Sequence, residues 1–146
     1  MFLVLKKRSL DKEPIQNKVF STLIKWRLVS KYCHGGIVIN NKIMHCTSKG
    51  LVSEDFTITK SDRYWDVIDL GNEIDDYVLD LFEQYKGTKY DWFSLIGFIL
   101  PWRVTNRKAM YCFEWCLLAM GGIITERVTP ENLYLLAIDK FRARYI

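Results

Sequence analysis

The chain has two histidines, His34 and His45, and both fall in one segment that predicts a β-hairpin. Asn40 and Asn41 separate its two strands and are typical of a two-residue turn, because asparagine tolerates left-handed backbone. Such a turn fixes the strand pairing and places His45 opposite Gly36. Since side chains alternate between the faces of a strand, we expect both imidazoles on one face as diagonal neighbours. Either histidine alone is better explained as a half-buried residue of a sheet, so the functional interpretation depends on the pairing.

Cys112 is the candidate nucleophile that this histidine pair would serve. It begins a short apolar helix, where unpaired N–H groups and the positive end of the helix dipole favour the thiolate. One histidine would hold the thiol proton and later deliver it to a leaving amine. The second histidine would fix the tautomer of the first, and N–H groups at the helix start would stabilise an oxyanion. These residue types together predict nucleophilic catalysis by a cysteine.

The other three cysteines are expected to be packing residues, since free cysteine behaves as a small apolar side chain. Cys116 lies one helical turn beyond Cys112 and therefore deeper. In the predicted register, Cys33 and Cys46 point away from the histidine face. No secretory signal is recognised, so we expect thiols rather than disulfide bridges.

Three residues near the candidate nucleophile have weaker functional interpretations. Glu114 follows Cys112 by two positions, where it would order the site or, equally, make a structural salt bridge. Tyr90 and Tyr111 would line the substrate pocket or donate to the oxyanion. Packing in an aromatic core is the more common use of such tyrosines.

The elements that must position these residues form a mixed pattern of short apolar runs and helical spacing. The runs predict strands over 2–5, 33–39, 42–47 and 65–70, and the spacing predicts helices over 17–30, 74–85, 91–100, 109–120 and from 130 onward. In the first helix, the apolar residues Val19 and Trp26 are expected inside, with Lys18 and Lys25 outside. The sequence thus predicts an α+β fold, with a small antiparallel sheet packed against helices and one domain over residues 1–146.

Composition excludes several classes of protein. The chain has 146 residues, of which 49% are hydrophobic and 26% charged, values typical of a globular domain and not of a disordered chain. A net charge of +4 is too small to indicate a nucleic-acid partner. Residues 1–31 hold eight basic and two acidic residues, or +6, and would attract anionic lipid or cell-wall polymer unless they form a solvated helix face.

No segment is long and apolar enough to cross a membrane as a helix. The longest uncharged runs span eleven residues, whereas a helix needs about 20 to cross the bilayer. We therefore expect synthesis in the cytoplasm, without a signal peptide or a transmembrane helix, in a phage or bacterial setting. The run 92–102 has a tryptophan at each end and would form a buried helix or, as the less favoured alternative, contact a membrane surface.

Three short motifs resemble the NlpC-type cysteine peptidase superfamily. They are Cys-His-Gly-Gly-Ile-Val-Ile at 33–39, Ile-Met-His-Cys at 43–46 and Tyr-Cys-Phe-Glu-Trp-Cys at 111–116. The cysteine follows the histidines, an order similar to the circularly permuted branch that includes YiiX-like proteins and lecithin retinol acyltransferase-like enzymes. Gly-Thr-Lys-Tyr-Asp-Trp at 87–92 and Thr-Pro-Glu-Asn-Leu-Tyr at 129–134 also resemble segments of that branch.

The resemblance implies a permuted papain-like fold that needs no cofactor. It also implies that Cys112 is the nucleophile, His34 the base and His45 the orienting residue. Phe113 departs from the pattern, because a small polar residue usually follows the cysteine. A histidine at position 45 fits the NlpC-type and acyltransferase-like patterns better than the YiiX-like one, which often has Glu there.

Functions from three classes are compatible with these residues. The first is a thiol hydrolase that cleaves an amide or peptide bond through an acyl-enzyme, and the resemblance implies peptidoglycan stem peptides as substrates. The second is a lipid acyltransferase or thioesterase that uses the same three residues. The third is a module without this chemistry: either a catalytically inactive interaction partner or a zinc site whose four ligands would be His34, His45, Cys112 and Cys116.

Overall fold

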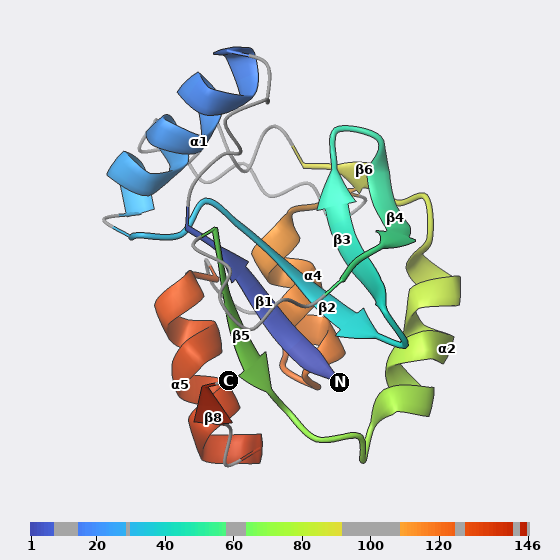
Figure 1. Ribbon diagram of the computed structural model, residues 1–146. Helices are drawn as coiled ribbons and strands as arrows, with labels where there is room; N and C mark the ends of the chain where they lie inside the picture. The colour runs from blue at the N-terminus through green and yellow to red at the C-terminus, as the bar shows by residue number, and fades with distance from the viewer. Residues whose placement is uncertain are drawn as a thin grey trace.

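A computed structural model describes residues 1–7, 15–28, 30–57, 64–91, 109–124, 128–141 and 144–145 (Figure 1). Its centre is a six-stranded antiparallel sheet in the order β4-β3-β2-β1-β5-β8. These strands are β1 (Phe2–Lys6), β2 (His34–Ile39), β3 (Lys42–Thr47), β4 (Gly50–Asp55), β5 (Trp65–Asp69) and β8 (Arg144–Tyr145). The protein is an α+β fold, as the sequence predicts.

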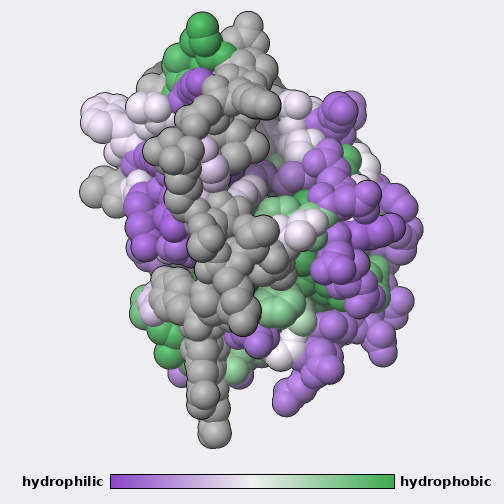
Figure 2. Space-filling view, viewed as in Figure 1, coloured by the Kyte–Doolittle hydropathy of each residue, from purple (hydrophilic) through white to green (hydrophobic). Residues whose placement is uncertain are grey.

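Four helices and a short parallel strand pair complete the described part of the chain. The helices are α1 (Ile15–Leu28), α2 (Asp75–Tyr85), α4 (Cys112–Ala119) and α5 (Pro130–Phe141), and the pair is β6 (Lys89–Tyr90) with β7 (Ala109–Met110). Within these ranges, no helix is both long and apolar enough to pass through a bilayer. Figure 2 shows that the surface over α2 is mainly hydrophilic, as the acidic residues there predict.

The β2–β3 hairpin has the predicted turn and register. Asn40 and Asn41 adopt φ angles of 51° and 59°, the left-handed backbone that a two-residue hairpin turn requires. Val38 pairs with Ile43, as expected for that turn. Alternation along the two strands therefore directs His34 and His45 to one face of the sheet.

Helix α4 packs against the opposite face of the hairpin (Figure 1). Trp115 is fully buried, and its indole N–H donates to the carbonyl of Met44 at 2.9 Å. Gly35 allows close approach of the helix, because a Cβ there would lie 3.1 Å from the ring of Phe113. This face holds the main core, which α2 and α5 extend through Phe82 and Leu133.

The histidine face of the sheet carries a smaller apolar cluster. Val4, Val38, Ile43 and Val67 are buried there. Phe2, Phe56 and Trp65 cover them in part, and the rings of Phe56 and Trp65 meet edge to face at 5.3 Å. The imidazoles therefore stand beside an apolar surface, on the side of the sheet away from α4.

Several predicted elements need correction. The helix expected over 109–120 begins only at Cys112, because residues 109–110 pair with β6 instead. Strand β4 was not predicted, since its exposed polar residues hide the alternation. The helix expected over 91–100 lies almost wholly outside the described residues.

Helix α1 has the expected location but not the expected burial. Val19 is 54% exposed and Trp26 is 76% exposed, so the prediction that both face the core is wrong. Helical spacing shows that apolar residues share a face, but it does not show whether another element covers that face.

Candidate active site

The structure brings the two histidines together across the β2–β3 hairpin. His34 Nε2 and His45 Nδ1 lie 2.9 Å apart, a hydrogen-bond distance, and the ring centroids are 5.1 Å apart. One nitrogen donates and the other accepts, so the contact fixes the tautomer of each ring relative to the other. In the tautomer in which His34 Nε2 is the donor, Nδ1 is the nitrogen of His34 that can take a proton.

His34 is held in the neutral form that a general base requires. Burial lowers its pKa well below the usual value, and the positive charges of His45 and Lys6 lower it further. The ring also meets Trp65 edge to face, with 6.3 Å between the ring centroids. At neutral pH the imidazole is therefore unprotonated and able to accept a proton.

His45 in turn lies beside a carboxylate that the sequence analysis missed. Its Nε2 is 3.4 Å from Oε2 of Glu54, which lies on β4. Burial lowers the pKa of His45, and the charge and hydrogen bonding of Glu54 oppose that shift. His34, His45 and Glu54 thus form a row across three adjacent strands. Only the pairing of β4 with β3 reveals it.

Cys112 is the first residue of α4, and its side chain is fully buried. The backbone N–H groups of Gly35 and Phe113 lie close enough to its sulfur to lower the thiol pKa, but burial outweighs them and raises it to about 12. The expectation that the helix start makes Cys112 a resting thiolate is therefore wrong. Loss of water around the sulfur destabilises the thiolate by more than the N-terminus of the helix stabilises it.

The sulfur lies beside the strand that carries His34, on the α4 side. Since it lies near the Gly35 N–H, the adjoining Cα of His34 is within about 6 Å. The imidazole leaves that Cα toward the other face of the sheet. No hydrogen bond joins the thiol to either imidazole among the residues described. His34 and Cys112 are each the first residue of their element, and catalysis would require their side chains to meet around the strand end.

Glu114 and Tyr111 organise the start of α4. The Tyr111 N–H donates to Glu114 Oε2 at 3.0 Å, the side-chain-to-backbone half of a capping box. Burial, together with nearby Asp91, raises the pKa of Glu114 to about 7. The Tyr111 hydroxyl donates to the Val128 carbonyl at 2.9 Å and accepts from the Val128 N–H at 2.8 Å, so it anchors the segment before α5.

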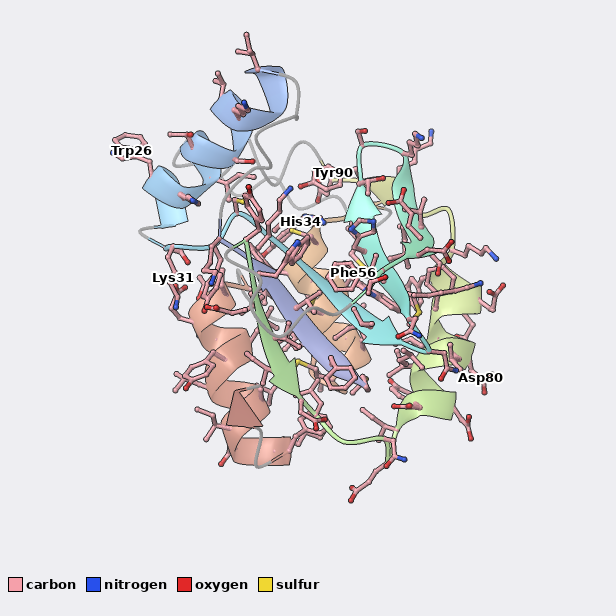
Figure 3. The ribbon with its side chains drawn as sticks, in the orientation of Figure 1. Trp26, Lys31, His34, Phe56, Asp80 and Tyr90 are labelled. Carbon is pink, nitrogen blue, oxygen red and sulfur yellow. The ribbon has the colours of Figure 1, made fainter. Side chains whose placement is uncertain are left out.

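Tyr90 lies near the candidate nucleophile. Burial raises the pKa of its phenol well above the usual value, and the neighbouring Cys112 and Cys46 thiols raise it further. In Figure 3, Tyr90 appears at the same end of the sheet as His34. Of the two tyrosines, Tyr90 is therefore the better candidate to line a pocket.

The remaining cysteines pack as expected. Cys46 and Cys116 are fully buried in the main core, and the thiol of Cys33 donates to the Lys6 carbonyl at 3.5 Å. All four cysteines of the chain are free thiols. In both Cys46 and Cys116, burial raises the thiol pKa, which favours the inert protonated form.

The zinc alternative requires four ligands to converge, and the structure does not gather them. All four of its residues are described, yet no group of three or more His, Cys, Asp or Glu side chains in the described ranges is placed to hold a metal ion. The run 92–102, which was considered for membrane contact, lies outside those ranges.

Comparison with known proteins adds no functional assignment. Neither a protein-family model nor a curated protein matches the chain. The geometry of the site must therefore support any function on its own.

Proposed function

We propose that the protein is a cysteine hydrolase that cleaves an amide or peptide bond through an acyl-enzyme on Cys112. The observation that carries this proposal is the 2.9 Å contact between His34 Nε2 and His45 Nδ1. That contact orients a neutral imidazole whose other nitrogen is available as a base. The thiol lies beside the backbone of the same strand.

The reaction begins with a neutral thiol and a neutral imidazole and not with an ion pair, because burial raises the pKa of Cys112 to about 12. As the sulfur attacks the carbonyl carbon of the substrate, its proton passes to Nδ1 of His34. N–H groups at the start of α4 stabilise the oxyanion. His34 then protonates the leaving nitrogen, the C–N bond breaks and a thioester forms.

Water completes the cycle. It attacks the thioester carbon and gives one proton to His34, the C–S bond breaks, and the sulfur recovers its proton from the imidazolium. His45 stabilises the positive charge that His34 carries at both stages, and Glu54 stabilises His45. An alcohol or amine in place of water would give acyl transfer, and a histidine at position 45 suits that reaction equally.

Peptidoglycan stem peptides are the first substrates to test, since the motif resemblance implies them. Purified protein would be incubated with soluble stem peptides, and the products would be separated by chromatography and identified by mass spectrometry. We expect new amine termini, and a rate at least about a thousandfold lower in Cys112→Ala. Cys116→Ala is the matched control, because it removes a buried thiol one turn away. Cleavage that persists in Cys112→Ala would refute the proposal.

A further inference from the structure

Helix α1 carries an exposed apolar stripe. Ile15, Val19 and Trp26 are 78%, 54% and 76% exposed. Their spacing of four and seven residues places them on one side of the helix, with exposed Thr22 between them. Figure 3 shows the Trp26 side chain directed away from the body of the protein. In Figure 2, hydrophobic surface gathers over α1 at the top of the view.

The same helix is strongly basic. Its sequence contains Lys18, Lys25 and Arg27 and neither Asp nor Glu, so the helix carries +3. Lys31 follows shortly after; its side chain is 62% exposed and pairs with Asp66 at 3.1 Å. An apolar stripe with an aromatic residue, on a helix with a net positive charge, is typical of helices that lie in a membrane interface.

The position of α1 leaves the stripe uncovered. The extensive packing of the described elements joins the sheet strands to α4, and α4 to α2 and α5, but does not include α1 (Figure 1). Helix α1 therefore stands beside the described body of the fold with Ile15, Val19 and Trp26 accessible.

We propose that α1 docks the protein on a membrane surface that contains anionic phospholipid. The stripe would enter the interface, with Trp26 at the level of the headgroups, and the basic residues would bind lipid phosphates. A second copy of the chain fits less well, because two helices of +3 would repel each other. His34 follows Leu28 by six positions, so docking would hold the candidate active site within about 20 Å of the membrane.

Vesicle flotation tests this docking independently of catalysis. Protein would be mixed with phosphatidylcholine vesicles that contain or lack phosphatidylglycerol. We expect the wild-type protein to float with the anionic vesicles, to bind neutral vesicles at least about tenfold more weakly, and to dissociate as salt rises. Cys112→Ala should float like the wild type, so loss of the hydrolase activity would not be mistaken for loss of docking.

Variants assign the binding to the stripe. Val19→Ser/Trp26→Ser should reduce flotation at least about tenfold. Leu135→Ser, at a position 63% exposed on α5, is the matched control and should leave flotation unchanged. Circular dichroism would confirm that each variant is folded. For the wild type, quenching of tryptophan fluorescence by brominated lipid, lost in Trp26→Phe, gives a second measurement.

Three results would overturn the proposal. The first is failure of the wild-type protein to float with anionic vesicles at low salt. The second is a folded double variant that floats as well as the wild type. The third is a concentration-dependent dimer that the double variant abolishes, which would assign the stripe to a second copy of the chain.

Discussion

At the scale of single residues, His34 and His45 are paired so that one nitrogen of each ring is engaged with the other. Their pairing was predictable because it depends on a local feature, the turn at Asn40 and Asn41. The burial that lowers both pKa values was not predictable, since it comes from elements distant in sequence. The same reason explains why the raised pKa of Cys112 was missed.

The lowered histidine pKa values predict a loss of stability in acid. In the unfolded chain these imidazoles titrate near 6.5, whereas the folded protein holds them neutral to lower pH. Between those values the unfolded state binds more protons, so stability is fully present above pH 6.5 and falls as the pH decreases below it. The thermal midpoint should therefore drop from pH 7 to pH 5, and it should drop less in His34→Gln.

The quantity to compare is the difference in thermal midpoint between the wild-type protein and His34→Gln at each pH. Glu114, whose pKa is raised to about 7, changes stability in the opposite direction over the same range, but it is present in both proteins and cancels. If the thermal midpoints of the wild type and His34→Gln change in parallel with pH, His34 is not held neutral in the folded protein.

Glu54 is predicted to be a positioning residue that acts through His45. Glu54→Gln removes the charge 3.4 Å from His45 Nε2 and so weakens stabilisation of the charged histidine pair during turnover. We expect kcat to fall about tenfold or more with little change in KM, and the acid limb of the pH profile to move. Asp55→Asn, on the same strand, is the control. An unchanged kcat and pH profile in Glu54→Gln would exclude this role.

At the scale of elements, the contact between α4 and β2 holds Cys112 beside the strand that carries His34. A helix through Cys112 was predicted, although its start was placed at 109, whereas β4 and the β6–β7 pair were not predicted, because each depends on non-local pairing. Glu54 was missed with β4. Local turns and caps are encoded in a few adjacent residues, whereas sheet neighbours are selected by the whole core.

Gly35→Ala is predicted to disturb this contact. The added Cβ would lie 3.1 Å from the Phe113 ring and 3.3 Å from Leu5, so α4 must shift or the side chains must repack. We expect a loss of about 1–3 kcal/mol in the free energy of unfolding, measured with urea, and a larger fractional loss of activity. Ser53→Ala, at an exposed position on β4, should change neither. A fully stable and active Gly35→Ala protein would contradict the close packing.

At the scale of the whole molecule, the α+β class and the antiparallel sheet followed from the sequence, while the exposure of α1 did not. The spacing of apolar residues on a helix face is the same whether a protein core or a membrane covers that face. Val19 and Trp26 are exposed, and we therefore propose a separate role for α1, docking, beside the sheet and helices that carry the candidate site.

The central claim is that Cys112 attacks a carbonyl carbon with His34 as its base. Intact-protein and peptide mass spectrometry after incubation with an activated acyl ester measures this directly, because the acyl group stays on the attacking sulfur. The account predicts one adduct, located on Cys112, absent in Cys112→Ala and formed at least about a hundredfold more slowly in His34→Ala. An adduct on Cys33, Cys46 or Cys116, or one that forms on Cys112 at an equal rate without His34, would contradict it.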